Sequence, residues 1–111
     1  MKDPERVVQR QLEAYNRRDL EAFLACYADD ARLWRLPERL TEQGREALRA
    51  RYRKRFDEAP NLHATIVRRI VLERFVVDHE HVTGTPEGPF DAIATYEVVD
   101  GRIANVWFCV P

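Results

Sequence analysis

Four consecutive titratable residues, Asp78-His79-Glu80-His81, offer the densest acid/base chemistry in the chain. They lie in a run with strand character, where alternate side chains point to opposite faces. Asp78 therefore shares one face with Glu80, and His79 shares the other with His81. Carboxyl and imidazole groups are common proton-transfer groups. Asp78 or His79 is therefore an acid/base candidate if the strand face that carries it lines a ligand cavity. The alternative for Asp78 is a structural cross-strand ion pair with Arg69.

Metal binding is the second chemistry that this segment could support. Two histidines at i and i+2 on one strand face can chelate an ion, but a third ligand is evident only if His63 comes close. A solvated strand face explains the same residues, so we expect no metal site. The sequence lacks a glycine-rich phosphate loop, a Walker pattern and Cys/His ligand pairs. We therefore expect no nucleotide, haem or zinc-finger site, and no cofactor.

A basic run at 49–55 is similar in composition to a nucleic-acid-binding patch. At about 100° per residue its cations spread round most of a helix and avoid only the stripe of Leu48, Tyr52 and Phe56. The whole chain has 18 Lys and Arg against 19 Asp and Glu, a formal net charge of -1. This balance favours a solvated amphipathic helix, and we expect neither nucleic acid nor membrane as a partner.

The length of 111 residues and the 45% hydrophobic content fit one domain, residues 1–111, with a single core. The segment Met1 to Arg6 is too charged for a secretory signal, and no apolar run reaches the roughly 20 residues that cross a bilayer. We expect a cytoplasmic protein. Its two cysteines, Cys26 and Cys109, are expected to be buried thiols.

Helical spacing of apolar residues predicts three amphipathic helices between Asp3 and Phe56. The three faces are Val8, Leu12 and Tyr15; Leu20, Phe23, Leu24 and Tyr27; and Leu48, Tyr52 and Phe56. Asp3, followed by Pro4, and Asp19 are predicted N-caps. Residues 31–36 are predicted as a short strand ended by Pro37, with an irregular loop continuing to Gly44.

From residue 62 onward, β-branched and aromatic residues predict strands at 62–72, 75–83, 90–99 and 102–110. Tight turns are predicted at Glu73-Arg74 and Asp100-Gly101, of which only the second has preferred hairpin chemistry. A two-residue first turn places Arg69 opposite Asp78, Arg68 opposite His79 and Val67 opposite Glu80. Helices followed by antiparallel strands predict an α+β fold, with three helices packed on a curved, mostly antiparallel sheet.

Several segments resemble the nuclear transport factor 2-like superfamily, which includes ketosteroid isomerases and SnoaL-like polyketide cyclases. The resemblance covers about residues 5–110 and is carried by residues 11–23, 27–31, 44–48 and 100–103. It implies a cone-shaped α+β barrel closed by helices around a ligand pocket. The superfamily hosts enzymes and non-enzymes, so the resemblance indicates the fold better than the activity.

Ketosteroid isomerases use an Asp base together with a Tyr and a protonated Asp that bind the developing oxyanion. Carried over by the resemblance, these positions fall at Arg35, near Gln11 and near Ile93. A guanidinium does not abstract protons at neutral pH, so steroid isomerisation is not expected. Tyr15 lies one turn beyond the catalytic tyrosine position and is expected only to bind ligand.

The resemblance also implies which strand side chains point into the cone and which point outward. It puts Val106 and Phe108 on the concave side, and an unbroken hairpin at residues 100–101 would pair Thr95 with Val106, Ile93 with Phe108 and Tyr96 with Asn105. The expected inward residues are Leu33, Arg35, Asp91, Ile93, Thr95, Val106 and Phe108. The expected outward residues are Trp34, Tyr96 and Trp107. An exposed aromatic patch of this kind predicts a homodimer through the convex face.

The sequence therefore predicts a small-molecule pocket protein, with cofactor-independent acid/base chemistry of the isomerase, cyclase or hydratase type. The alternative is a homodimer that binds a ligand, or is purely structural, without turnover. The catalytic candidates are Asp78, His79 and Asp91, and the ligand-binding candidates are Tyr15, Arg35, Ile93, Thr95 and Phe108. Arg35 is expected to lie at the apolar rim, to clamp an anion, or to pair with Asp91. The expected ligand is partly apolar and, if Arg35 is free, anionic.

Overall fold

The computed structural model describes residues 3–111, so Met1 and Lys2, with which the predicted non-secretory segment begins, lie outside it. Nine elements follow in order: α1 (Pro4–Arg17), α2 (Leu20–Ala25), β1 (Tyr27–Arg35), β2 (Arg39–Gln43), α3 (Arg45–Glu58), β3 (His63–Leu72), β4 (Phe75–Thr83), β5 (Phe90–Val99) and β6 (Arg102–Cys109). All three predicted helices and the four C-terminal strands are present. The α+β class is confirmed.

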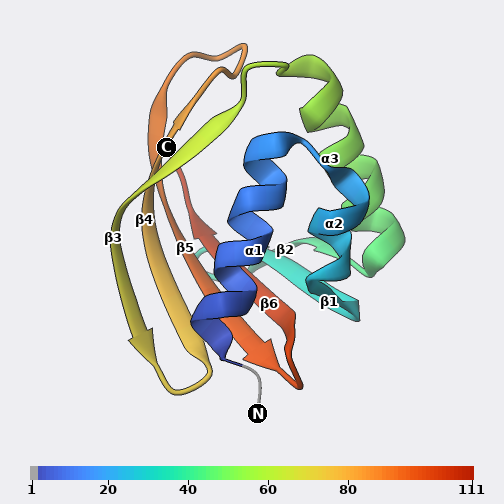
Figure 1. The fold of residues 1–111 in the computed structure, drawn as a ribbon, viewed down its shortest axis with the longest axis vertical. Helices are drawn as coiled ribbons and strands as arrows, with labels where there is room; N and C mark the ends of the chain where they lie inside the picture. The colour runs from blue at the N-terminus through green and yellow to red at the C-terminus, as the bar shows by residue number, and fades with distance from the viewer. Residues whose placement is uncertain (1–2) are drawn as a thin grey trace.

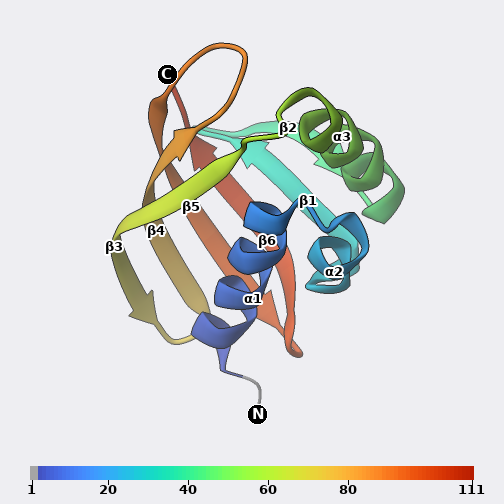
Figure 2. The same ribbon diagram turned by 45° about the horizontal axis from the view of Figure 1, so that its top comes forward.

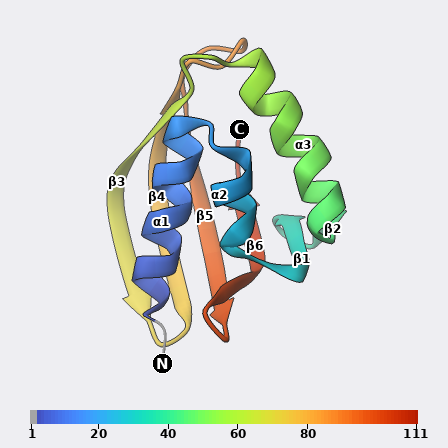
Figure 3. The ribbon, with the colours of Figure 1, turned by 45° about the vertical axis from the view of Figure 1, so that its right-hand side comes forward.

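One curved sheet carries all six strands in the order β2-β1-β6-β5-β4-β3, and the helices lie on its concave side (Figures 1 and 2). Every neighbouring pair is antiparallel except β1 with β6, which is parallel. The sheet does not close on itself, because β2 and β3 are both edge strands. The cone is therefore completed by helices, and in Figure 3 α3 stands beyond α2 with β1 and β2 near its lower end.

Side-chain caps set where the first two helices begin. The Asp3 carboxylate accepts a hydrogen bond from the Glu5 backbone N–H at 3.0 Å, and the Asp19 carboxylate accepts one from the Ala22 N–H at 3.2 Å. These bonds satisfy helix N–H groups that have no partner inside the helix. Both predicted N-caps are confirmed.

Polar contacts then fasten the end of α1 to the start of β3. The Asn16 side chain donates to the Ala64 carbonyl at 3.0 Å and accepts from the Ala64 N–H at 2.8 Å. Arg18 also donates to the Leu62 carbonyl, at 2.9 Å. This junction fixes the helical layer against one edge of the sheet.

Two predicted boundaries in the first half are wrong. The predicted loop before Gly44 contains β2, which forms a hairpin with β1. Tyr27, assigned to a helical face, begins β1 and is fully buried there. The sequence Arg-Leu-Thr-Glu-Gln of β2 has little β-branched or aromatic content, so its strand state comes from pairing with β1.

Two β-bulges shift the predicted strand registers. The β3–β4 register breaks between Ile66 and Arg68, so Arg69 pairs with Asp78 and Arg68 with His79 as predicted, but Ile66 rather than Val67 lies opposite Glu80. The extra residue in β3 keeps both Ile66 and Arg69 on the inner face.

The β5–β6 hairpin breaks in the same way between Glu97 and Val98, where β6 carries Ala104 as an extra residue. Val98 pairs with Ile103 as predicted, but beyond the bulge Tyr96 pairs with Val106, Thr95 with Trp107, and Ile93 with Cys109. A one-residue slip exchanges the two faces of a strand. The predicted inward and outward residues of β5 are therefore reversed.

In the part of the chain that the structure describes, no helix combines the length and apolar character needed to span a membrane.

Candidate functional site

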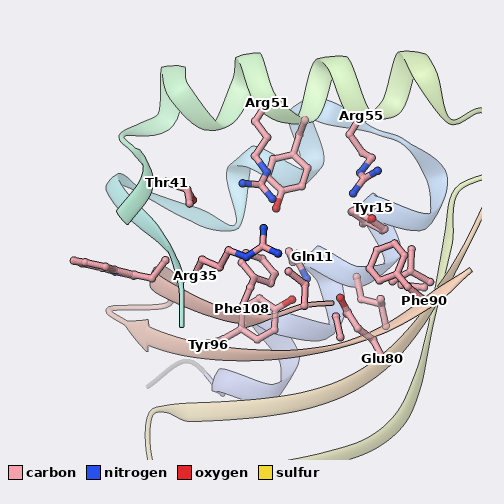
Figure 4. Close-up of a pocket in the computed structure, with 17 residues that line it drawn as sticks. Gln11, Tyr15, Arg35, Thr41, Arg51, Arg55, Glu80, Phe90, Tyr96 and Phe108 are labelled. Carbon is pink, nitrogen blue, oxygen red and sulfur yellow. The ribbon is translucent and has the colours of Figure 1, made fainter. Parts of the chain in front are cut away.

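A cavity of about 100 Å³ lies between the inner face of the sheet and the helices α1 and α3. Its floor is formed by β4, β5 and β6, including Glu80, Ala92 and Phe108. Ala92 lies directly opposite Glu80 in the sheet, and its short side chain leaves the space above it open. Figure 4 shows the side chains of both walls converging on this space.

Glu80 reaches into the cavity from β4, on the side where Gln11 and Tyr96 lie (Figure 4). Burial raises the pKa of its carboxyl from the usual 4.5 to about 7, and the nearby Asp78 carboxylate adds to the shift. Desolvation and a like charge both disfavour the ionised form. Glu80 is therefore divided between acid and base near neutral pH, which suits proton transfer in either direction.

Asp78 lies on the same strand face as Glu80, but its carboxylate is already paired. Arg69 donates from Nε to one oxygen at 2.7 Å and from Nη2 to the other at 3.0 Å. Arg69 also donates to Gln9 on α1 at 2.8 Å. The predicted Arg69–Asp78 ion pair is present. It joins β3 to β4, and the bond from Arg69 to Gln9 links this pair to α1.

Three phenol groups, those of Tyr15, Tyr52 and Tyr96, contribute to the cavity wall. Burial is the main cause that raises the pKa of each phenol. They are protonated at neutral pH and can donate hydrogen bonds to a ligand oxygen. The Tyr15 ring is held edge-on against Tyr52 and Phe56, with centroids 6.4 Å and 5.7 Å away.

Gln11 occupies the position that the resemblance matched to a catalytic tyrosine, and it is buried. Its Oε1 accepts a hydrogen bond from the Tyr27 hydroxyl at 3.1 Å, while its Nε2 donates to the Val8 carbonyl at 3.3 Å. The side chain is oriented by these two contacts at the cavity wall.

The opposite wall is basic, with Arg35 on β1 and with Arg51 and Arg55 on α3. Arg51 pairs with Glu42 at 2.6 Å, and Arg55 has a longer contact with Glu87 at 3.5 Å. Arg35 lines the cavity as predicted, although the residue is exposed, and its Nη2 donates to the main-chain oxygen of Pro111 at 3.0 Å. The alternative that Arg35 pairs with Asp91 is wrong, because Asp91 lies on the other face of the sheet with His79 and His81.

Of the predicted site residues, Tyr15, Arg35 and Phe108 line the cavity. Asp91, Ile93 and Thr95 do not, because the Ala104 bulge turns Ala92, Ala94 and Tyr96 inward in their place. Ile93, the position that the resemblance matched to the second isomerase carboxyl, lies on the outer face opposite His79. Cys109 was expected to be buried and is exposed.

His79 also lies on the outer face, where it joins His81 and Asp91. Nε2 of His79 is 2.8 Å from one Asp91 oxygen, and Nδ1 of His81 is 2.7 Å from the other. The hydrogen bonds from His81 and His79 lower the pKa of Asp91. Across residues 3–111, no group of three or more His, Cys, Asp or Glu side chains is arranged to hold a metal ion.

Sequence reasoning missed Glu80, Arg51, Arg55 and Tyr96 as cavity residues. The signal for the two arginines was their i, i+4 spacing beside Tyr52, which puts both on the edge of the apolar stripe. Glu80 was recognised as sharing a face with Asp78, but not as the member left without an arginine partner. The inward position of Tyr96 depends on the bulge at Ala104, which no local residue pattern indicates.

A family model described as a SnoaL-like domain matches residues 8–106. A cystatin-fold protein from Novosphingobium aromaticivorans superposes with a TM-score of 0.88 at 26% identity, over 97% of each chain. A nuclear transport factor 2-like protein from Cytophaga hutchinsonii gives 0.84 at 11% identity, over 100% of this chain and 92% of that one.

A provisionally assigned ketosteroid isomerase from Kribbella flavida gives a TM-score of 0.85 at 18% identity, over 97% of this chain and 77% of that one. No curated protein matches the chain in sequence. At these identities the two structures from Cytophaga and Kribbella support the fold alone.

Proposed function

The chain belongs to the SnoaL-like domain family of the nuclear transport factor 2-like superfamily, and on that premise we propose that it is a cofactor-independent acid/base enzyme with Glu80 as its proton-transfer group. The observation that carries the proposal is a carboxyl group that lines an internal cavity and has a pKa of about 7. Carboxyl groups shifted towards neutrality in this way cluster at catalytic sites.

The proposed reaction is proton transfer at a carbon next to a carbonyl group. The Glu80 carboxylate takes the proton, the C–H bonding electrons move towards the carbonyl oxygen, and an enolate-like oxygen develops. A phenol from Tyr15 or Tyr96 donates a hydrogen bond to that oxygen, which stabilises the developing charge. Glu80 then returns the proton to the same carbon or to a neighbouring one. Isomerase, cyclase and hydratase reactions share this step.

The other predicted acid/base groups support the proposal less well. Asp78 is held by two hydrogen bonds from Arg69, so its carboxylate is not available to a substrate. His79 and Asp91 lie on the outer face of the sheet and bond to each other. Of these groups, only Glu80 combines a place in the cavity wall with a pKa suited to neutral solution.

The test is exchange of carbon-bound hydrogen with solvent deuterium, followed by NMR. We use 4-methyl-2-oxopentanoate and its amide, because both carry an acidic methylene beside a carbonyl. We expect the wild-type protein to accelerate exchange in at least one of them, and Glu80→Gln to slow it by about 100-fold or more. The kcat/KM for exchange should rise as pH increases through about 7 and then level off.

Asp91→Asn is the matched control, because it removes a carboxylate from the outer face of the same sheet. It should leave the exchange rate unchanged. Catalysed exchange that survives Glu80→Gln, or that is lost in Asp91→Asn, would contradict the assignment of Glu80.

We also propose that the protein is a homodimer formed through the outer face of the sheet. Trp34 and Trp107 are register neighbours on β1 and β6, and the Trp34 indole N–H donates to Asn105 at 3.0 Å. Tyr96, the third aromatic residue expected there, is buried on the inner face instead. Both tryptophans are half-buried, and within residues 3–111 no helix covers the sheet face on which they lie.

A further inference from the structure

Three guanidinium groups face Glu80 across the cavity, and the proposed proton transfer needs none of them. Figure 4 shows Arg51 and Arg55 entering the space from α3 and Arg35 entering it from β1, while Glu80 enters from the sheet. Positive charge gathered on one wall of a partly apolar cavity is a binding determinant for an anionic group.

Two of these arginines lie near one aromatic ring. Arg35 is the register partner of Phe108, and the guanidinium carbon of Arg51 lies 5.8 Å from the centre of the Phe108 ring. Phe108 itself lines the cavity. The ring therefore forms an apolar surface close to both arginine residues.

The charges of this pair are only partly balanced. Arg51 has one carboxylate partner, Glu42. Arg35 donates to the main-chain oxygen of Pro111, the last residue of the sequence, and within residues 3–111 it has no Asp or Glu carboxylate within 4.0 Å. A carboxylate placed between the two arginines would neutralise the charge that remains and would accept hydrogen bonds from both forks.

The cavity volume limits the size of the ligand. Since one ordered water needs roughly 10–15 Å³ by this measure, a volume of about 100 Å³ has room for roughly seven to ten water molecules. This volume suits a small ligand better than a tetracyclic one. The apolar part of the wall, which includes Leu12, Val82 and Phe90, suits a short hydrocarbon chain or one small ring.

We propose that the cavity binds a small, partly apolar organic acid, with its carboxylate between Arg35 and Arg51 and its hydrocarbon part over Phe108 and Ala92. Only the further step, which turns the acidic C–H of that ligand towards Glu80, rests on the proposed function. Binding of the acid can be measured without any turnover.

Binding of the acid should be coupled to the protonation of Glu80. A bound anion in the same cavity disfavours the ionised form of Glu80, so its pKa rises further and a proton is taken up. The charged and titratable groups around Glu80 are Asp78 on β4, Tyr15 on α1, Tyr52, Arg51 and Arg55 on α3, Arg35 on β1 and Tyr96 on β5. Near pH 7, about half a proton should be taken up per ligand bound.

The experiment is calorimetric titration with 4-methyl-2-oxopentanoate and, as a neutral match of equal size, 4-methyl-2-oxopentanamide. The wild type should bind the acid at least about tenfold more tightly than the amide. Arg35→Leu should remove that preference, and Arg35→Lys, which keeps the charge but loses the fork, should retain part of it. Arg53→Leu changes an exposed arginine of α3 outside the cavity and should retain all of it.

Repeating the titration in two buffers of different ionisation enthalpy measures proton uptake, which should disappear in Glu80→Gln while the acid still binds. Ala92→Leu, which fills the floor without changing charge, should abolish binding of both compounds. Thermal melts without ligand confirm that each variant is folded.

Equal affinity of the wild type for acid and amide, or an acid preference that survives in Arg35→Leu, overturns this inference, and so does the absence of measurable acid binding. A failure of the proposed function gives a different result. If only the proposed function fails, the acid still binds through Arg35, but deuterium exchange does not depend on Glu80.

Discussion

At the scale of single residues, Asp78 and Glu80 illustrate how a partner decides the role of a carboxyl group. Both side chains point inward from β4, two positions apart. Asp78 is almost fully buried, yet two hydrogen bonds from Arg69 stabilise its charge. Glu80 lines the cavity, no arginine within residues 3–111 bonds to it, and burial raises its pKa to about 7. One carboxyl is therefore held in an ion pair, while the other is the group to which we assign proton transfer.

The raised pKa of Glu80 predicts how stability depends on pH. Below pH 4.5 the carboxyl is protonated in both the folded and unfolded states. As pH rises from 4.5 to about 7, the unfolded chain loses the proton while the folded protein keeps it, so wild-type stability falls. We compare the unfolding free energy of Glu80→Gln with that of the wild type at two pH values. The difference, variant minus wild type, should be about 2–3 kcal/mol more favourable to the variant above pH 7 than at pH 4.

Urea denaturation of both proteins at several pH values measures this difference. Glu97→Gln is a control of opposite sign, because hydrogen bonds from Arg74 and Asn105 lower the pKa of Glu97. The Glu97→Gln variant should be less stable than the wild type at neutral pH, and this loss of stability should shrink as pH falls through the acid range. A difference between wild type and Glu80→Gln that is the same at pH 4 and pH 8 would show that Glu80 has an ordinary pKa.

At the scale of elements, the two bulges decide which side chains reach the cavity. The extra residue in β6 brings Tyr96 and Ala92 to the inner face and sends Asp91, Ile93 and Thr95 outward. The break in β3 keeps Ile66 opposite Glu80 and Arg69 opposite Asp78. The cavity thus depends on irregularities in its strands as much as on the strands themselves.

The backbone segment just before β3 lies very close to the segment just after β4. Gly84 follows β4 with φ +82, and a Cβ there would lie 2.2 Å from the Asn61 carbonyl oxygen. We predict that Gly84→Ala costs about 3 kcal/mol or more, because a positive φ costs an L-residue about 1–2 kcal/mol and the overlap forces the backbone apart.

Gly88→Ala is the matched control for this prediction. Gly88 has φ +91, but no described atom lies within 4 Å of an added Cβ. Gly88→Ala should therefore lower the unfolding free energy by only about 1–2 kcal/mol. Chemical denaturation of the two variants gives the comparison. Equal destabilisation would mean that the contact with Asn61 does not constrain this junction.

At the scale of the whole molecule, the helices cover one face of the sheet and leave the other bare. The concave face holds the core and the cavity, whereas the outer face carries the Trp34–Trp107 pair and the cluster of His79, His81 and Asp91. A bare sheet face with large aromatic residues is a common surface for self-association.

The corresponding prediction is that wild type is a dimer at micromolar concentration and that Trp107→Arg is a monomer. An arginine at the centre of the patch would place unpaired positive charge on both sides of a two-fold interface. Static light scattering gives the two masses, and Arg53→Glu on the exposed side of α3 is a charge-changing control that should remain dimeric. A monomeric wild type would rule out this assembly.

The sequence by itself determined the elements and their order. Apolar periodicity, two aspartate caps and the Asp100-Gly101 turn are local signals, and they predicted three helices and the four C-terminal strands with small errors at the ends. The resemblance added the superfamily. Local signals also found the Arg69–Asp78 pair, because the break in β3 lies on the far side of it from the turn.

Tertiary structure alone decided which residues form the site. No local property of Ala104 marks it as an extra residue, yet its insertion reverses every inward and outward assignment along β5 beyond the bulge. β2 forms because β1 supplies its hydrogen-bond partners. The raised pKa of Glu80 comes from what packs around it, since a pKa depends on solvent exclusion and neighbouring charge, which exist only once distant segments have come together.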